Sequence, residues 1–594
     1  MSSVFAVVCD GANTGEGTRL DTAARAFLPF VPEGSKQWEV GEGTTALAWS
    51  VLDEGPRGSF WWEAPGNDRV VIFDGWFSEG SSPGPSASQG LARCLEREAP
   101  ADLTRRLGGE WSLVEVSPRV VRCACDFAGS RHLYVAQRGS RAVVSNRAMI
   151  CAALLNGGEV PRPDPFHMGW LLTLAAAPMG RGTPWRDVSL LKAGEAVTIR
   201  DGAVEILDST PVPERVPWED LFEEFVERCS QVRNAGGLPF RVGLTGGKDS
   251  RLVWGGLRAA GLLDELEGAY LKAREGTADV KVGRSLAEAE GVAFRLEEPG
   301  DGTSPTWEDF VERIDRHGFQ SEYGLNAWDL KAVVRRRREG RLHGNLGEIF
   351  RGYTKVPHWL SWRQVRRFYS REKFVDPLGV LTEEARQGYA GFMNRWVEER
   401  RRAGTKRTQI HDEYHAHARM QRWVGQTQLI DGCGVYSMNP IPSPRLFGHF
   451  QTLSLRDRVA ERVHFELMGR CGRDLVERPF AGDRWSKWLG PGAAFPRPVT
   501  SKSVTGEAEG GKGVSPQLER WIRHGSAIEE YLLDDGDSSF FDLVDRRRLE
   551  RFFDDMPGRP GFVELRAIYG LLGIRRALDE EIESMPFEME KRRR

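Results

Sequence analysis

The sequence predicts an α/β protein with a layered, β-rich N-terminal domain (residues 1–210) and a C-terminal domain built on a parallel sheet (residues 211–594). Two patterns support this prediction. The first part alternates short apolar or β-branched runs with turn signals, and the second alternates strand-like runs with amphipathic helical stretches. Pro211, Pro213 and Pro217 stand between the two parts and mark a linker. With 594 residues the chain is long enough for two domains with substantial cores.

Strands in the first domain are expected where β-type runs end at turn residues. The clearest runs cover residues 5–8, 70–73, 111–116, 120–125 and 142–144. Residues 196–207 form a predicted hairpin, because Asp201-Gly202 at its middle suits a tight type I′ turn. This succession of short strands predicts stacked layers of sheet.

The second domain is expected to begin with a helix over residues 218–234, where apolar residues recur at helical spacing. A strand then runs into the Gly246-Gly247 turn, and the apolar stretch after it predicts a second helix. Two further strand-like runs, 267–271 and 292–296, flank another amphipathic helix. Strands that alternate with helices imply a parallel sheet, and such sheets bind ligands at the carboxyl ends of their strands.

Charge and composition exclude several classes of function. The net charge is −3, so no strong field draws the chain to nucleic acid or to an anionic membrane. The longest apolar stretch, Met168 to Met179, is far shorter than the roughly 20 residues that span a bilayer. The eight cysteines are scattered without a Cys-x-x-Cys pair, so we expect reduced thiols, no zinc site and a cytoplasmic protein.

The most informative motif is the stretch from Val242 to Arg251, Val-Gly-Leu-Thr-Gly-Gly-Lys-Asp-Ser-Arg. Glycines let the backbone turn tightly and approach a ligand, and a helix start offers free N–H groups to an anion. The stretch lacks the Gly-x-x-x-x-Gly-Lys-Ser/Thr pattern of ordinary phosphate loops. It resembles the pyrophosphate-binding loop, Ser-Gly-Gly-x-Asp-Ser, of the asparagine synthetase-like ATP pyrophosphatase superfamily. The resemblance implies that ATP and pyrophosphate contact Leu244, Thr245, Gly246, Gly247, Asp249 and Ser250.

A second stretch, Leu342 to Tyr353, resembles the family's Ser-Gly-x-Gly-x-Asp-Glu-x-Phe-Gly-Gly-Tyr. The resemblance places the His343-Gly344 turn against ATP, and it places a backbone contact to adenine near Lys272. It therefore implies an adenine-nucleotide α-hydrolase-like fold for the synthetase domain.

The resemblance is incomplete at the metal site. The match is one residue short, and the family's metal-binding aspartate falls on Gly347. Magnesium needs only one or two carboxylates in addition to phosphates and water. Asp249 and Glu348 are therefore the predicted Mg²⁺ ligands, with Glu348 also a predicted catalytic carboxylate. The alternative for Glu348 is an ordinary carboxylate that the helix dipole favours.

A catalytic cation is expected further along the chain. Residues 478–487 stand where the family has an Arg-x-Lys whose lysine neutralises the α-phosphate of the acyl-adenylate. A cation there is chemically reasonable, because charge builds on the phosphate as the tetrahedral intermediate collapses. Lys487 and Arg484 are the two candidates, and an exposed surface cation is the alternative for each.

The first domain resembles the N-terminal glutaminase domain of asparagine synthetases, which has an Ntn-type fold. The matching segments are Asp74-Gly75, Gly109 to Ser112, Asp126 to Gly129, His132 to Tyr134, and Val144 to Asn146. In that family a cysteine directly follows the initiator methionine and attacks glutamine, whereas this chain has Ser2. The difference implies a domain without glutaminase chemistry, so the attacking amine must come from elsewhere. An N-terminal serine hydrolase, with the α-amino group of Ser2 as its base, is the alternative.

Within the superfamily, the Gly-Gly loop and the Gly-Glu-x-Phe-Arg-Gly motif most resemble the sequences of the lasso-peptide cyclases (lasso macrolactam synthetases). The resemblance implies an enzyme that uses ATP and Mg²⁺ to adenylate an Asp or Glu side chain of a core peptide. The peptide's N-terminal amine then forms the ring, with release of AMP and pyrophosphate. Implied partners are the precursor or core peptide, a leader-binding recognition protein and a leader peptidase, and no nucleic acid or membrane.

Besides the serine hydrolase, the sequence leaves three other functions open. A β-lactam synthetase or an ammonia-dependent asparagine synthetase-like ligase would also need no glutamine. A non-catalytic ATP-binding scaffold would explain the replaced cysteine and Gly347. The retained Gly246-Gly247-x-Asp249-Ser250 argues against a scaffold, because a scaffold needs no pyrophosphate loop.

Overall fold

The structure is a computed structural model. It describes residues 3–10, 20–21, 24, 28, 34–41, 43–50, 60–66, 68–78, 87–157, 161–175, 178–234, 238–297, 339–352, 360–425, 435–489, 498–499, 516–534, 538–556 and 560–579. Ser2, the candidate N-terminal nucleophile, lies outside these residues.

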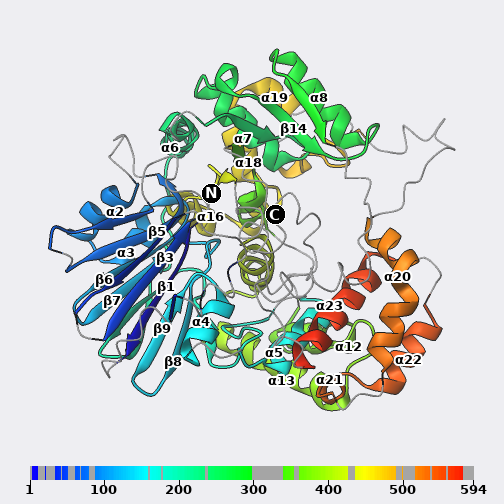
Figure 1. Cartoon of the computed structure of the whole chain (residues 1–594). Coiled ribbons are helices and arrows are strands. Elements are labelled where there is room, and N and C mark those ends of the chain that lie inside the picture. The colour runs from blue at the N-terminus through cyan, green and yellow to red at the C-terminus, as the bar shows by residue number, and fades with distance from the viewer. Residues whose placement is uncertain are drawn as a thin grey trace, which may run out of the picture.

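Two six-stranded sheets form the N-terminal part (Figure 1). The first has the strand order β10-β8-β9-β1-β3-β2 and the second β12-β11-β7-β6-β5-β4, with antiparallel pairing throughout. The strands are β1 Ser3–Asp10, β2 Gly34–Glu39, β3 Thr44–Ser50, β4 Trp61–Glu63, β5 Val70–Ser78, β6 Gly108–Ser117, β7 Val120–Cys125, β8 Tyr134–Arg138, β9 Arg141–Ser145, β10 Val188–Leu190, β11 Glu195–Arg200 and β12 Ala203–Asp208.

The two sheets pack face to face, with one helical layer on each outer side. Val7 and Val144 of the first sheet share a buried core with Ile72 and Val114 of the second. Helix α4 (Ala148–Leu155) packs against the first sheet. Helices α2 (Ala87–Leu95) and α3 (Pro100–Arg106) pack against the second. The predicted layered, β-rich domain is therefore confirmed.

A five-stranded parallel sheet forms the core of the second part, with the order β15-β14-β13-β16-β17. The strands are β13 Phe240–Gly243, β14 Gly268–Lys272, β15 Phe294–Glu297, β16 Gly340–Leu342 and β17 Tyr436–Met438. The helices around them are α6 Trp218–Ser230, α7 Lys248–Ala259, α8 Ala278–Ala289, α18 Arg462–Cys471 and α19 Arg473–Glu477 (Figure 1). The α/β fold class predicted from the alternation of strands and helices is confirmed.

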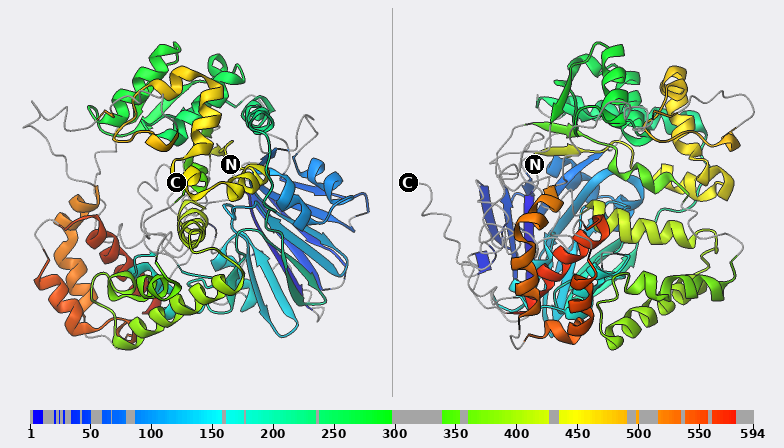
Figure 2. Two further views of the ribbon diagram at one scale, coloured as in Figure 1. Left: turned by 180° about the vertical axis from the view of Figure 1, so that it is seen from behind. Right: turned by 90° about the vertical axis from the view of Figure 1, so that its right-hand side faces the viewer.

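The remaining described elements are mostly helical. They are α5 Pro165–Met168, η1 Gly169–Leu172, η2 Gln231–Asn234, η3 Leu263–Glu265, η6 Asn345–Phe350, α11 Trp362–Ser370, α12 Glu372–Val375, α13 Glu383–Arg402, α14 Ile410–Tyr414, the π-helix η7 His415–Val424, α16 Pro444–Thr452, α17 Leu455–Val459, η8 Lys487–Leu489, α20 Pro516–Leu533, α21 Phe540–Leu543, α22 Arg546–Asp554 and α23 Phe562–Leu578. The C-terminal helices α20–α23, orange to red in Figure 2, share one buried core with α4, α5 and α13. None of the helices among the described residues is both long and apolar enough to cross a membrane.

Gln421 on the π-helix η7 joins the β-rich layers to the second part of the chain. Its side-chain amide donates to Leu191 O (2.7 Å) and accepts from Ala193 N (3.3 Å). Its backbone carbonyl accepts a hydrogen bond from His132 Nε2 (2.7 Å). Gln421 is buried, so each of these bonds replaces water that the groups have lost.

We expect Gln421→Ala to lower the free energy of unfolding by about 1–3 kcal/mol, because it leaves the buried carbonyl of Leu191 and the partly buried amide of Ala193 without this partner. Urea unfolding measures the effect. Gln387→Ala, at an exposed position on α13, is the control and should change stability by less than about 0.5 kcal/mol. Equal stability of the two variants would contradict a structural role for Gln421.

Candidate nucleotide-binding site

The loop from Leu244 to Gly247 connects the carboxyl end of β13 to the start of α7. Leu244 N donates to Tyr270 O of the neighbouring strand (2.9 Å), which fixes the loop at the edge of the sheet. Helix α7 is twelve residues long, and its N-cap Gly247 has no side chain to satisfy the first amides. This is the place where a parallel sheet binds its ligand, and the helix dipole favours an anion there.

The loop amides already face oxygen acceptors. Gly246 N donates to Asp279 Oδ1 (2.9 Å), Gly247 N to Thr245 Oγ1 (3.1 Å), and Thr245 N to Ser250 Oγ (3.1 Å). One of these acceptors is a carboxylate contributed by α8, so the Gly246 amide is oriented to bind an anionic oxygen. Asp279 was not predicted, because nothing in its local sequence indicates a contact with residues 33 positions earlier.

A cavity of about 490 Å³ opens beside this loop. Its lining residues are Gly243, Thr245, Asp249, Ser250, Tyr270, Leu271, Lys272, Arg341, His343, Gly344, Asn345, Glu348, Arg419, Val424, Val435 and Ser437. The lining includes seven of the predicted site residues: Thr245, Asp249, Ser250, Lys272, His343, Gly344 and Glu348. It does not include Leu244, Gly246, Gly247, Arg484 or Lys487. The volume lies in the range of pockets that bind small molecules and cofactors.

Asp249 has a protein partner on each carboxylate oxygen. His464 Nε2 donates to Oδ1 (2.7 Å), and Arg351 pairs with Oδ2 (2.7 Å). Burial alone would raise the pKa of the Asp249 carboxyl, but the charge of Arg351 and the hydrogen bond from His464 together lower it below its ordinary value. Asp249 is therefore ionised and held in one orientation.

The backbone of two glycines packs directly on Asp249. A Cβ at Gly344 would lie 2.7 Å from the carbonyl carbon and oxygen of Asp249, and a Cβ at Gly347 would lie 2.3 Å from Asp249 Oδ1. Any side chain at either position would collide with Asp249. Glycine at these positions thus allows the 343–347 segment to approach the start of α7 closely.

We expect Gly344→Ala to destabilise the fold by about 1–3 kcal/mol and to reduce any turnover at this cavity at least about tenfold, because the new methyl group meets backbone that cannot rotate away. Gly391→Ala on α13 is the matched control, since only the end of the Arg395 side chain approaches a Cβ there (3.5 Å). That control should be neutral or slightly stabilising. Steady-state turnover and thermal unfolding of both variants test the expectation.

Glu348 faces two basic side chains across the cavity from the π-helix. His415 Nε2 lies 3.4 Å and Arg419 Nε 3.7 Å from its Oε2. Burial would raise the pKa of Glu348, but the interaction with His415 lowers it below its ordinary value. π-Helical segments are rare and frequently lie at functional sites. Here the π-helix supplies the His415 and Arg419 side chains that pair with Glu348.

The predicted Mg²⁺ site is tested by these contacts. Both oxygens of Asp249 are bonded to Arg351 and His464, and position 347 has no carboxylate. Glu348 is paired with basic groups. In the part of the chain that the structure describes, no group of three or more His, Cys, Asp or Glu side chains could hold a metal ion. These residues do not fit a resident metal bound between Asp249 and Glu348.

The two predicted α-phosphate cations lie outside the cavity. Arg484 and Lys487 are both exposed. Their segment is anchored to the loop, because Ala481 N donates to Gly246 O (3.0 Å). Lys248 completes the anchor: its buried ammonium pairs with Glu461 and with Asp483 (2.8 Å) and donates to Arg484 O (3.0 Å). The structure thus brings this segment to the loop, while Lys272, Arg341 and Arg419 are the basic side chains in the lining.

His343 connects the cavity to the β-rich layers. Its Nε2 lies 2.5 Å from Ser437 Oγ and 3.9 Å from Glu110 Oε2, a buried carboxylate on β6. Burial, assisted by the positive charge of Arg131, lowers the pKa of His343 to about 3. The imidazole is therefore neutral near pH 7 and can bind a ligand without adding charge to the cavity.

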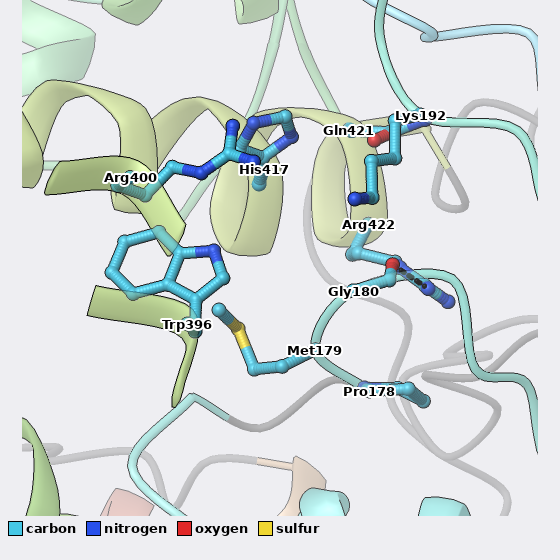
Figure 3. Close-up of a pocket in the computed structure, with 9 residues that line it drawn as sticks. All are labelled: Pro178, Met179, Gly180, Lys192, Trp396, Arg400, His417, Gln421 and Arg422. Atoms are coloured by element: carbon cyan, nitrogen blue, oxygen red, sulfur yellow. Dashed lines mark hydrogen bonds between the residues drawn. The ribbon is translucent and has the colours of Figure 1, made fainter. Parts of the chain in front are cut away.

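A second cavity lies where the β-rich layers meet the π-helix (Figure 3). Lys192, Arg400, His417 and Arg422 surround it above Trp396, as Figure 3 shows. Its volume of about 10 Å³ has room for a single water molecule. Burial lowers the pKa of Lys192 and lowers that of His417 to about 4. This small cavity is therefore part of the polar contact between the β-rich layers and the π-helix. The cavity of about 490 Å³ is the candidate site.

Comparison with known proteins adds little to this geometry. No protein-family model and no curated protein sequence matches the chain. Among solved structures, a glutamine phosphoribosylpyrophosphate amidotransferase from B. subtilis, complexed with ADP and GMP, matches 52% of this chain and 69% of its own at 12% identity and a TM-score of 0.24. An allosteric regulatory enzyme of purine biosynthesis matches 50% of this chain and 80% of its own at 10% identity and a TM-score of 0.26. Scores this low identify neither a family nor a function.

Proposed function

We propose that this protein is an ATP-dependent amide ligase that closes a macrolactam ring in a peptide, as in lasso-peptide biosynthesis. The observation that carries the proposal is the cavity of about 490 Å³ beside a Gly-Gly loop at the carboxyl edge of the parallel sheet. Leu244, Thr245, Gly246, Gly247 and Ser250 are the proposed binding residues for the pyrophosphate part of ATP. Phosphate oxygens would replace Asp279 Oδ1, Thr245 Oγ1 and Ser250 Oγ as the acceptors of the loop amides. His343, Gly344 and the backbone near Lys272 are proposed to contact the rest of the nucleotide.

The proposed reaction has two steps. A side-chain carboxylate of the core peptide attacks the α-phosphorus of ATP, and pyrophosphate leaves. The N-terminal amine of the same peptide then attacks the acyl-adenylate, and AMP leaves with formation of the amide. The contribution of the chain is to position both reactants and to neutralise charge. ATP enters as its Mg²⁺ complex, which is a substrate of the reaction.

Roles for the basic residues follow from their positions. Arg484 and Lys487 lie on the segment anchored at Gly246, and one of them is the proposed α-phosphate cation. Reaching the cavity would require a movement of that exposed segment when ATP binds. Glu348 is the proposed catalytic carboxylate, because its side chain lines the cavity and is ionised.

The amine is proposed to come from the peptide itself. The chain has Ser2 where the resembling glutaminases have a nucleophilic cysteine. Trp76, which follows Asp74-Gly75 on β5, is fully buried in an apolar core shared with Val242 and Leu244 of the parallel-sheet part. This packed contact supports a β-rich domain that serves as structure. A leader-binding recognition protein and a leader peptidase would deliver the freshly cut core peptide.

The test is incubation of the protein with Mg·ATP and a candidate core peptide whose leader has been removed, followed by mass spectrometry. We expect a peptide product lighter by one water, together with AMP. A panel with a small β-amino-acid-like substrate, and with aspartate plus ammonium, covers the other ligases of this type. Turnover only with a small substrate, or ATP binding without turnover, would overturn the macrolactam assignment.

A further inference from the structure

We infer that Arg351 is the built-in counter-ion of Asp249, so that the protein binds no divalent metal at this carboxylate. The inference deepens the proposed function, because it states how the cavity is charged before Mg·ATP enters. It rests on contacts among described residues, and its test uses neither ATP nor peptide.

The pairing is direct, and it covers both oxygens of the Asp249 carboxylate. Arg351 lies 2.7 Å from Asp249 Oδ2, and its Nε lies 3.2 Å from Glu461 Oε1. His464 Nε2 occupies the other oxygen of Asp249 at 2.7 Å. Arg351 and His464 are largely buried, so water screens these contacts weakly. A charge-assisted contact at this distance is among the stronger polar interactions in proteins.

Each carboxylate of this cluster has a cation beside it without a metal. Glu461 pairs with Arg351 and with the ammonium of Lys248, which also pairs with Asp483, so three carboxylates share the two cations Arg351 and Lys248. Glu461 adopts a left-handed backbone conformation (φ 59°) at the start of α18, which costs free energy in a residue with a side chain. In this conformation the Glu461 carboxylate forms ion pairs with both Lys248 and Arg351.

The segment that supplies Arg351 also removes space for a second carboxylate. Gly347, four residues earlier, approaches Asp249 so closely that a Cβ would lie 2.3 Å from Oδ1. A divalent ion requires several oxygen ligands. A dication at Asp249 would also be repelled by the guanidinium that shares the same carboxylate. Gly347 and Arg351 therefore have complementary effects. Gly347 contributes no carboxylate at Asp249, and Arg351 contributes a positive charge there.

Binding of Mn²⁺ to the nucleotide-free protein, followed by electron paramagnetic resonance of the free ion, tests the inference. Wild type and Asp249→Asn should bind Mn²⁺ equally weakly. Arg351→Met, which frees one oxygen of Asp249, should raise the affinity about tenfold or more. The double variant Arg351→Met/Asp249→Asn should return to the wild-type level, and Arg351→Lys should stay near it.

Arg462→Met on α18 is the control, because the Arg462 guanidinium pairs with Asp457 and Glu466. Tighter Mn²⁺ binding by wild type than by Asp249→Asn would overturn the inference, and this comparison holds even if Arg351→Met fails to fold. Unchanged affinity in a folded Arg351→Met would also overturn it. A protein that fails to convert ATP to AMP, yet shows the expected Mn²⁺ pattern, would refute the proposed reaction and leave this inference standing.

Discussion

Replacing Arg251 with methionine is expected to lower the free energy of unfolding by about 3 kcal/mol or more. Arg251 lies on α7 directly after the Gly-Gly loop and is completely buried. Its guanidinium donates to Leu475 O (3.1 Å), Arg478 O (2.8 Å) and Pro479 O (2.5 Å). The guanidinium carbon Cζ of Arg251 lies 3.7 Å from the ring centre of Phe480, which is a cation–π contact. Methionine fills part of the volume but leaves three carbonyl groups without this donor.

The same substitution should also impair ATP turnover. The carbonyls that Arg251 binds lie in residues 475–479, directly before the segment that contacts Gly246. Loosening this connection should move Ala481 and the residues after it away from the loop. Urea unfolding and steady-state turnover measure the two effects. Arg473→Met, at a side chain that is 89% exposed, is the matched control and should change stability by less than about 0.5 kcal/mol. An Arg251→Met protein as stable as this control would refute the anchoring role.

Asp249→Asn is expected to reduce pyrophosphate release about a hundredfold or more. Asparagine keeps the shape of the side chain but removes the charge that balances Arg351, 2.7 Å away. The guanidinium then keeps only its pair with Glu461, and it should turn toward the cavity and bind the phosphates in an unproductive orientation. We expect the loss mainly in kcat, because the loop amides that bind the phosphates are unchanged. The pKa of Asp249 is lowered in the folded protein, so its ion pairs contribute stability above the ordinary carboxyl pKa, and that contribution is lost as the pH falls through the lowered value.

Asp220→Asn is the control for this prediction. Asp220 forms an exposed ion pair with Arg445 (3.3 Å) and does not line the cavity. We expect its turnover to equal that of wild type, since exposed ion pairs contribute little. Asp249→Asn with a wild-type rate would show that this carboxylate has no part in the chemistry.

The sequence was sufficient to predict the local parts of the site. A strand, two glycines and a helix start are consecutive in the chain, so Gly246-Gly247 could be placed at the sheet edge from the pattern alone. The fold class and most strands could also be predicted, because apolar runs, turn residues and helical stretches alternate along consecutive parts of the chain. Strands β2 and β3 were not predicted, because Gly34–Glu39 has no apolar alternation and gains its structure by pairing with Thr44–Ser50.

The partners of the site residues could not be predicted, because they come from distant segments. His464 lies 215 positions after Asp249, and Glu461 lies 213 positions after Lys248. Arg351 stood inside a recognised motif, yet its pairing with Asp249 depends on the close approach of Gly347. The inference that Asp249 binds no metal depends on this pairing: local sequence shows a carboxylate, and only the fold shows which cation it faces.

The most direct test of the central claim follows one oxygen atom. A core peptide with ¹⁸O in its side-chain carboxylate is incubated with Mg·ATP and the protein, and the nucleotide products are analysed by mass spectrometry. Attack of the carboxylate on the α-phosphorus predicts AMP that carries one ¹⁸O atom, with the other retained in the new amide. ADP with labelled inorganic phosphate, or AMP without label, would contradict adenylation of the peptide by this protein.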